Sequence, residues 1–389
     1  MKKILRIINR FNLGGPTYNA AYLTKYLEPD YETLLIGGQH DESEKSSMHI
    51  LDNLGLKPTI IPEMQRSLNP YKDQIAFKKI QNIIKDFKPD IVHTHAAKAG
   101  ALGRRAAYKM GVKQIYHTFH GHVFHSYFGS FKTRIFKEIE KNLAKKTTKI
   151  IAISEIQKSE LSKIHKICPE KKIEVIPLGF DLERFNTDKD SKRKEFRKKW
   201  NLKENEIAIG IIGRLVPIKN HKFFIDAVQE VLKKSKVPIR AFIVGDGEEK
   251  QNIVNYINNK NLDFSIDFTP ATFHLTSWIK EIDRVNSGMD IICLTSLNEG
   301  TPVSLIEAQA SGKPIVSTKT GGIENIVLEN KTALLSEKND LHNFSKNLLS
   351  LVNDSNKRKL FSKFGLEKSK DFQYDQLVIN IKNLYEKML

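Results

Sequence analysis

A chain of 389 residues is long enough for two domains, each with its own hydrophobic core. Its composition, 40% hydrophobic and 28% charged, is typical of a globular protein. No apolar run approaches the roughly 18 residues of a transmembrane helix, and the one after Met1 is too short for a signal peptide. Cys168 and Cys293 form neither a disulfide framework nor a zinc-ligand spacing, which fits a reducing cytoplasm.

The positive charge is concentrated in the first half of the chain. The formal net charge is +18, and residues 1–200 carry 38 Lys and Arg against 22 Asp and Glu. Residues 201–389 are almost balanced, with 25 against 23. We expect an anionic partner for the N-terminal half, such as lipid headgroups, a phosphorylated acceptor or nucleic acid. A lysine-rich genome is the alternative explanation.

Short apolar runs alternate with helical patterns in the first half of the chain. This alternation predicts βαβ units and a parallel sheet. Strands are expected near residues 4–8, 32–36, 59–61, 90–93, 114–118, 149–153 and 173–176, and helices at 17–26, 74–85 and 131–144. The following segment, 188–204, is dense in Lys, Arg and Asp and predicts a solvated linker.

A second alternating series follows, with strands expected near 207–212, 240–244, 264–268, 290–294, 314–317 and 332–335. The last helix has an apolar stripe and must pack against another part of the chain, and we expect it to pack back on the N-terminal domain. We therefore expect an α/β protein with two doubly wound, Rossmann-like domains facing a cleft. The domains would span 1–187 and 205–370, joined by the linker 188–204 and followed by a C-terminal helical segment, 371–389.

The most informative run contains Glu299 and Glu307. Thr301 is a good helix N-cap, Pro302 suits the first helical position, and Gly312 fits the left-handed residue that ends a helix. Glu299 should therefore lie in the loop before the helix and Glu307 on the helix. Backbone N–H groups at such a helix start bind phosphate, while carboxylates accept hydrogen bonds from sugar hydroxyls. The run predicts a site for a nucleotide-sugar.

Three glycine-containing turns follow predicted strands. Gly14 and Gly15 allow close approach of the backbone to a ligand, and Thr17 can cap the next helix. Gly213 precedes Arg214 and Lys219, two cations suited to a diphosphate, although basic loop residues are often merely solvated. The turn at Gly245 lacks the third glycine of a dinucleotide fingerprint, which favours a tight turn beside a nucleotide over a nicotinamide site.

Histidines gather near the ends of two predicted strands, at His93, His95, His117, His120, His122 and His125. Their spacing lacks the ligand pairs of zinc sites, so we expect no metal. Neutral imidazoles facing a cleft can instead hydrogen-bond sugar hydroxyls. Residues 131–149 combine an apolar stripe (Phe131, Ile135, Ile139 and Leu143) with the cations Lys132, Arg134, Lys137, Lys141, Lys145 and Lys146, which indicates either a membrane-surface helix or a core-packed helix. Aromatic residues at 123–128 could also touch lipid.

Taken together, these runs resemble family 4 of the retaining glycosyltransferases, which have the two-domain GT-B fold. The resemblance covers essentially the whole chain. It rests on Gly14-Gly15, the runs 89–95 and 175–185, Thr118-Phe119-His120, Gly213-Arg214 with Lys219, Gly245-Asp246-Gly247 and, most specifically, the two glutamates with seven residues between them. One departure is Leu178, where the family usually has Asn.

The resemblance implies roles for these residues. Glu307 would bind the ribose and Glu299 the donor sugar, with His120 beside that sugar. Arg214 and Lys219 would bind the diphosphate together with the backbone at Gly300, Thr301, Pro302 and Val303, and the donor site would also include Gly14, Gly15, Gly213 and Gly245. His120, Glu299, Arg214 and Lys219 would be catalytic. The family implies retention of configuration without a protein nucleophile and without a metal.

We therefore expect a glycosyltransferase at the inner face of the cytoplasmic membrane. It would move a sugar from a nucleoside diphosphate, such as a UDP-hexose or UDP-N-acetylhexosamine, to a polyprenyl-diphosphate-linked or other anionic acceptor in bacterial surface-polysaccharide synthesis. A nucleotide-sugar epimerase or hydrolase of the same fold stays open. A nucleic-acid-binding protein would explain the charge, but no nucleic-acid module is recognisable. The sequence leaves the base, sugar, acceptor, linkage and oligomeric state open, and places the base pocket near Phe268–Ala271.

Overall fold

The computed structural model describes the whole chain except residues 13, 41–45, 66, 68, 122–129 and 388–389. The chain forms two compact units, one of Met1–Phe180 with Asp371–Leu389 and one of Asp181–Lys370. Each unit contains a seven-stranded sheet whose strand pairs are all parallel. No helix among the described residues combines the length and the apolar character needed to span a bilayer.

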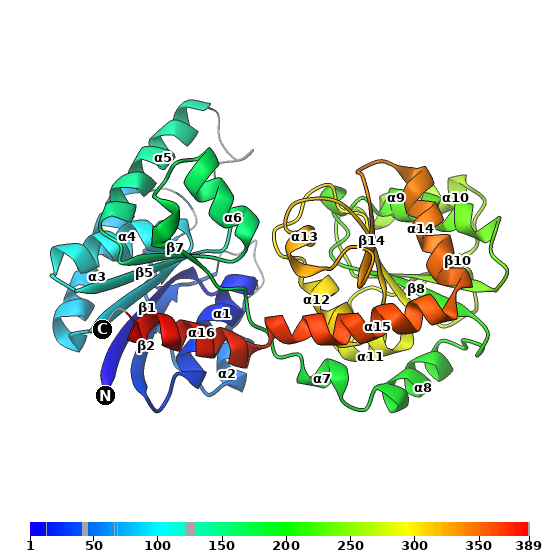
Figure 1. Cartoon of the computed structure of the whole chain (residues 1–389), viewed down its shortest axis with the longest axis horizontal. Helices are drawn as coiled ribbons and strands as arrows, with labels where there is room; N and C mark the ends of the chain where they lie inside the picture. Colours follow the sequence, from blue (N-terminus) through cyan, green and yellow to red (C-terminus); the bar gives the residue numbers. More distant parts are fainter. Residues whose placement is uncertain (13, 41–45, 66, 68, 122–129, 388–389) are drawn as a thin grey trace. The chain divides into compact units, whose positions relative to one another are not determined.

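The sheet of the first unit has the strand order β3-β2-β1-β4-β5-β6-β7 (Figure 1). Its strands are β1 (Lys2–Arg10), β2 (Tyr31–Gly38), β3 (Thr59–Ile60), β4 (Ile91–His95), β5 (Gln114–Phe119), β6 (Lys149–Ala152) and β7 (Ile173–Val175). Its helices are α1 (Gly15–Tyr26), α2 (Met48–Asn53), α3 (Pro70–Phe87), α4 (Ala97–Lys109), α5 (Ser130–Lys145), α6 (Glu155–Ser159), the π-helical turn η1 (Glu160–Ile164), the 3-10 turns η2 (Glu170–Lys172) and η4 (Lys370–Phe372), and α16 (Tyr374–Glu386).

The sheet of the second unit has the order β10-β11-β9-β8-β12-β13-β14. Its strands are β8 (Ile207–Ile212), β9 (Ile239–Val244), β10 (Phe264–Ser265), β11 (Phe273–Leu275), β12 (Ile291–Leu294), β13 (Ile315–Thr318) and β14 (Ala333–Ser336). Its helices are α7 (Glu183–Asn186), α8 (Lys189–Lys199), the 3-10 turn η3 (Pro217–Lys219), α9 (His221–Leu232), α10 (Lys250–Asn259), α11 (Ile282–Gly288), α12 (Val303–Ala310), α13 (Ile323–Ile326), α14 (Leu341–Asn353) and α15 (Ser355–Ser369).

Two doubly wound α/β units confirm the predicted fold class. Every predicted strand is present, although β10 is shorter than expected. Strand β11 was not predicted, because its three residues are too few to show an alternating pattern.

Strand alternation divides the first unit into two hydrophobic layers. Ile4 contacts the layer under α1 and α16, whereas its neighbour Leu5 contacts the layer under α3 and α4. Helix α16 supplies Leu377, Ile381, Leu384 and Tyr385 to the first of these layers. The C-terminal helix is thus part of the core of the N-terminal unit.

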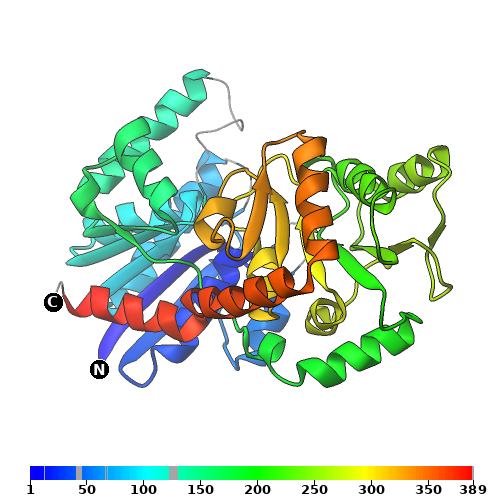
Figure 2. The same cartoon turned by 45° about the vertical axis from the view of Figure 1, so that its right-hand side comes forward.

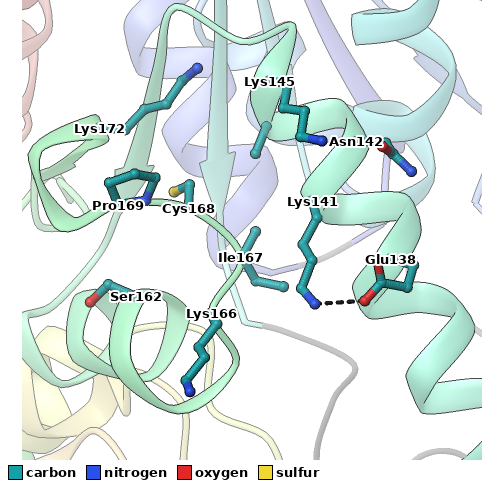
Figure 3. Close-up of a pocket in the computed structure, with 11 residues that line it drawn as sticks. Glu138, Lys141, Asn142, Lys145, Ser162, Lys166, Ile167, Cys168, Pro169 and Lys172 are labelled. Carbon is teal, nitrogen blue, oxygen red and sulfur yellow. Dashed lines mark hydrogen bonds and ion pairs between the residues drawn. The ribbon is translucent and has the colours of Figure 1, made fainter.

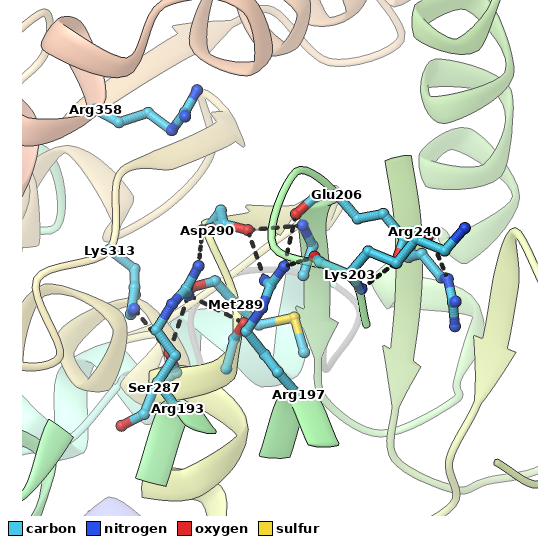
Figure 4. A network of polar contacts seen from close by, with 12 residues as sticks. Arg193, Arg197, Lys203, Glu206, Arg240, Ser287, Met289, Asp290, Lys313 and Arg358 are labelled. Atoms are coloured by element: carbon cyan, nitrogen blue, oxygen red, sulfur yellow. Dashed lines mark hydrogen bonds and ion pairs between the residues drawn. The ribbon is translucent and has the colours of Figure 1, made fainter. Parts of the chain in front are cut away.

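The predicted linker is largely a helix. Within 188–204, α8 forms part of the second unit, and Figure 2 shows it in green along the outside of that unit. Arg193 Nη2 donates to Asp290 Oδ1 at 2.7 Å and Arg197 Nη1 donates to Asp290 Oδ2 at 3.3 Å (Figure 4). Arg193 Nη1 also donates to the backbone carbonyls of Ser287, Gly288 and Met289, at the C-terminal end of α11. The charges that suggested a solvated segment therefore attach α8 to the sheet.

Candidate active site

The candidate site of the second unit lies where its strand order reverses. Strand β8 pairs with β9 on one side and β12 on the other, so the connections after β8 and β12 diverge. Such a point at the carboxyl ends of parallel strands is where open α/β sheets bind ligands. The predicted residues Gly213 to Lys219 follow β8, and Glu299 to Val303 follow β12.

Lys219 and Glu299 form an ion pair at this point. Lys219 Nζ donates to Glu299 Oε1 at 2.5 Å, and Ser296 Oγ donates to the same oxygen, also at 2.5 Å. The Thr295 hydroxyl donates to the Lys219 carbonyl at 2.9 Å and so ties the turn η3 to the end of β12. The structure therefore brings together the expected sugar-binding carboxylate and one of the two expected diphosphate-binding cations.

Arg214 differs from Lys219 in its surroundings. Its side chain is exposed, and no hydrogen bond or ion pair joins it to any described residue. The positive charge of Lys219 is balanced by Glu299, whereas that of Arg214 is not. Arg214 therefore remains available to an anion.

Close backbone contacts hold the loops of the site. A Cβ atom on Gly245 would lie 1.9 Å from the Gly213 carbonyl oxygen, so only glycine allows these loops to pack together. A Cβ atom on Gly322 would lie 1.8 Å from the Gly300 carbonyl oxygen. The Gly322 N–H also donates to the Glu299 carbonyl at 3.1 Å. The loop after β13 thus fixes the backbone that carries Glu299.

Helix α12 begins beside this loop, as the sequence predicts. It starts at Val303 with Pro302 at the N-cap, and no side chain caps it, so the prediction that Thr301 is the cap is wrong. The first backbone N–H groups of a helix have no partner within the helix and can face an anion. Gly312, with φ 67°, follows the C-terminus of α12 as predicted.

Thr17, in the first unit, is not a helix cap either, because it lies inside α1 and its hydroxyl donates to the Asn12 carbonyl.

Glu307 lies on α12, partly buried. Burial raises the pKa of its carboxyl to about 7, against an opposing effect of Arg184 and a reinforcing effect of Asp283. No hydrogen bond or ion pair joins the Glu307 carboxylate to the described residues. Because no neighbouring donor among these residues offsets the cost of burying this carboxylate, it is suited to accept hydrogen bonds from a ligand.

The predicted residues of the first unit surround its own strand reversal, between β1 and β4. Gly14 precedes α1, and Gly15 packs against Leu178, the residue that departs from the family pattern. His120 follows β5, and its Nε2 atom is 3.0 Å from His95 Nδ1. The rings of His93 and His95 stack at a centroid distance of 4.3 Å, and those of His95 and His120 at 5.3 Å.

His117 does not join this stack, contrary to the expectation that the strand-end histidines face together. It lies on the opposite face of β5, where a Cβ atom on Gly100 of α4 would clash with its ring. His122, His125 and the aromatic segment 123–128 lie outside the described residues. Within the described part of the chain, no group of three His, Cys, Asp or Glu could hold a metal ion.

Two features of the sites were missed in the sequence. The first is Arg6, which lies fully buried in β1 next to the histidines; its signal in the sequence was an arginine inside an otherwise apolar strand. The second is the pair Gly321-Gly322 after β13, whose signal in the sequence was the glycine pair itself. Residues 267–270, where the base pocket was predicted, line a shallow hollow of about 450 Å³ together with Asn201. This segment precedes β11 and therefore lies away from the carboxyl ends of the strands, where the candidate site is.

Two family models match successive parts of the chain. Residues 14–184 match the model described as Glycosyltransferase Family 4, and residues 192–368 match that of Glycosyl transferases group 1. The boundary between the two matches lies close to the boundary between the two structural units.

Relatives and solved structures agree with these matches. The chain is 32% identical over 332 residues to an Escherichia coli UDP-Gal:alpha-D-GlcNAc-diphosphoundecaprenol alpha-1,3-galactosyltransferase, covering 85% of this chain and 83% of the relative. The fold is similar to that of HepE from Anabaena, solved in complex with UDP, with a TM-score of 0.82, 18% identity and full coverage of both chains. A glycosyltransferase from Rickettsia africae gives a TM-score of 0.81 at 20% identity, with 100% and 98% coverage. The chain therefore belongs to the family 4 glycosyltransferases, with a GT-B fold.

Proposed function

We propose that this protein is a retaining, metal-independent glycosyltransferase that moves a sugar from a UDP-sugar to a polyprenyl-diphosphate-linked or similar anionic acceptor in bacterial surface-polysaccharide synthesis. The observation that carries the proposal is the arrangement at the β8–β12 reversal. There the Lys219–Glu299 pair, the exposed Arg214 and the start of α12 meet at one sheet edge. The E. coli relative, named for a UDP-Gal donor and a lipid-diphosphate acceptor, supports the substrate classes.

The proposed donor site assigns one chemical task to each group. Glu307 accepts hydrogen bonds from the ribose hydroxyls, and Glu299 accepts them from the transferred sugar. Arg214, Lys219 and the backbone N–H groups of Gly300, Thr301 and Val303 contact the diphosphate. Cleavage of the anomeric C–O bond leaves negative charge on the diphosphate, and fixed cations and a helix start stabilise that charge in the transition state. We propose His120 as the donor-sugar contact of the first unit.

Retention follows, in this proposal, from attack of the acceptor on the face that the diphosphate leaves. The acceptor hydroxyl forms the new bond to the anomeric carbon and passes its proton to the departing phosphate oxygen. The cations assigned to the diphosphate make a divalent metal unnecessary. Undiminished transfer in the presence of a chelator supports this part of the proposal, and restoration by added Mg²⁺ or Mn²⁺ after a loss contradicts it.

The acceptor side of the proposal uses the basic first unit. A cavity of about 450 Å³ lies between α5 and the segment 162–172, and Figure 3 shows the lysines around it. Lys145, Lys166 and Lys172 line it, and no carboxylate of the described residues pairs with them. Nearby exposed isoleucines lie on α5 and η1, namely Ile135, Ile139 and Ile164. Cations with exposed apolar side chains suit an anionic membrane surface, on the cytoplasmic side where nucleotide-sugars are made.

The predicted stripe of α5 is thus divided. Ile135 is 45% exposed and Ile139 is 41% exposed, whereas Leu143 is buried. Part of the helix contributes to the core and part remains accessible to a membrane.

Product analysis tests the proposed reaction. The protein is incubated with UDP-galactose and GlcNAc-diphosphoundecaprenol, and with a panel of other UDP-, GDP- and ADP-sugars, and products are identified by mass spectrometry. We expect a disaccharide lipid with the α configuration. Donor turnover without acceptor, to a free or epimerised sugar, would identify a hydrolase or epimerase instead.

Glu307→Ala is expected to reduce transfer, because a charge-assisted hydrogen bond contributes roughly 1.5–3 kcal/mol. Glu230→Gln, at a partly exposed carboxyl on α9, is the control.

Vesicle sedimentation tests the membrane contact. Binding to vesicles containing anionic lipid should weaken with salt and with the combined change of Lys145, Lys166 and Lys172 to Gln. The matched control changes Lys233, Lys234 and Lys236, three exposed lysines of the second unit. Equal loss in both triple variants, or equal binding to neutral vesicles, would contradict the assignment. Tight binding of DNA or RNA at physiological salt would instead favour the nucleic-acid alternative.

A further inference from the structure

A buried arginine lies at the centre of the histidine group in the first unit. Strand alternation places Arg6, His93, His95 and Thr118 on the sheet face covered by α1 and α16. Arg6 is fully buried and pairs in register with His93. Among the described residues no carboxylate contacts it, and its contacts are His93, His95 and the phenol of Tyr385 on α16.

A guanidinium can only donate hydrogen bonds, and this property assigns the protons of its neighbours. Arg6 Nη1 donates to His93 Nδ1 at 3.0 Å and to His95 Nε2 at 3.4 Å. Both ring nitrogens must then carry a lone pair. The proton of His93 consequently lies on Nε2, where it is donated to Thr118 Oγ1 at 2.8 Å. The Tyr385 hydroxyl donates to the same His93 Nδ1 at 2.6 Å and agrees with this assignment.

The proton of His120 is assigned by its contact with His95. With its Nε2 atom accepting from Arg6, His95 carries its proton on Nδ1 and donates it to His120 Nε2 at 3.0 Å. Burial lowers the pKa of His120 to about 3, so the ring is neutral near pH 7. A neutral imidazole that accepts at Nε2 must be protonated at Nδ1. That Nδ1 atom is buried and has no hydrogen-bond partner among the described residues.

We propose that Arg6 is a positioning residue that acts through His95 to fix His120 as the Nδ1–H tautomer, so that His120 donates a hydrogen bond to a substrate oxygen and does not act as a base. The substrate group is an oxygen acceptor, such as a sugar hydroxyl. This inference rests on the proposed role of His120 at the donor sugar. Burial, with a further contribution from the positive charge of Arg6, lowers the pKa of His93 and His95 well below the ordinary histidine value, so both rings stay neutral.

Histidine-selective ¹⁵N labelling with two-bond ¹H–¹⁵N correlation spectra tests the proposal in the intact protein. The signals of His120 are assigned from their loss in His120→Asn. We expect a protonated Nδ1 and an unprotonated Nε2 in the wild-type protein at neutral pH. An Nε2–H tautomer or a doubly protonated ring would overturn the proposal, and this spectrum requires no variant of Arg6.

Variants then test whether Arg6 is the cause. Arg6→Met removes the donor and the charge while keeping a long apolar side chain, and His120 is expected to populate both tautomers. The value of kcat should fall up to about tenfold, the effect of one neutral hydrogen bond. Arg6→Lys, which keeps a cationic donor, should restore the Nδ1–H form in part. Tyr385→Phe removes the other donor to His93 and should leave the His120 tautomer unchanged. An unchanged tautomer in folded Arg6→Met would contradict the role of Arg6.

The two proposals can fail separately. A correct tautomer with no loss of transfer in His120→Ala would remove His120 from the reaction while leaving the proton assignment in place. Sugar transfer by a protein whose His120 carries its proton on Nε2 would leave the proposed function standing and reject the present inference.

Discussion

The ionisation of Glu307 links the stability of the protein to its binding of the donor. Burial raises the pKa of this carboxyl from 4.5 to about 7. One pKa unit corresponds to about 1.4 kcal/mol, so keeping Glu307 ionised in the folded protein costs about 3 kcal/mol. Because the folded protein binds this proton more tightly than the unfolded chain does, the associated stability is fully present below pH 4.5. It is lost as the pH rises through about 7.

The change Glu307→Gln removes this cost and keeps the size of the side chain. At pH 8 we expect the free energy of unfolding to rise by up to about 3 kcal/mol, whereas at pH 5 the variant should differ little from the wild type. Urea unfolding at both pH values measures the difference. Glu230→Gln, at a partly exposed carboxyl whose pKa is lowered by its hydrogen bond to Lys233, should show no such dependence between pH 5 and pH 8.

Donor binding should depend on pH in the opposite direction. Ribose hydroxyls donate to a carboxylate, so the ionised form of Glu307 binds and the protonated form binds weakly. Titration calorimetry with a UDP-sugar, whose diphosphate diester does not titrate near neutrality, should give about tenfold tighter binding at pH 8 than at pH 6. The same affinity at both pH values would refute the assignment. So would a dependence on pH that persists in Glu307→Gln.

Three further predictions concern the second unit. Asp290→Asn should lower the free energy of unfolding by about 3–5 kcal/mol, because it leaves two arginines of α8 without their carboxylate. As a control, Lys233→Ala, at an exposed ion pair, should change the free energy of unfolding by less than about 1 kcal/mol. Gly322→Ala should displace the carbonyl of Gly300 and so lower both the melting temperature and the affinity for the donor. An unchanged affinity would show that this contact does not shape the site. Arg214→Gln should leave the free energy of unfolding within about 0.5 kcal/mol but reduce kcat/KM, and unchanged kinetics would exclude Arg214 from diphosphate binding.

Local patterns in the sequence determine much of this protein. The alternation of apolar runs and helical patterns predicts both sheets, because burial of a parallel strand or one helix face imposes its period on neighbouring residues. The positions of Glu299 in a loop, Glu307 on α12 and Gly312 at its end follow from the preferences of a few adjacent residues. Family motifs add the likeness to glycosyltransferases.

Tertiary structure decided which side chains meet. The pairing of Lys219 with Glu299 joins loops 80 residues apart, and the attachment of α8 through Asp290 joins residues more than 90 apart. Arg6 reaches the histidines because β1 lies beside β4 and the strands alternate in register. None of these contacts leaves a periodic signal in the chain, because each depends on strand order and register. Charge identifies the residues, and only the folded sheet determines which of them are neutralised and which remain available to a ligand.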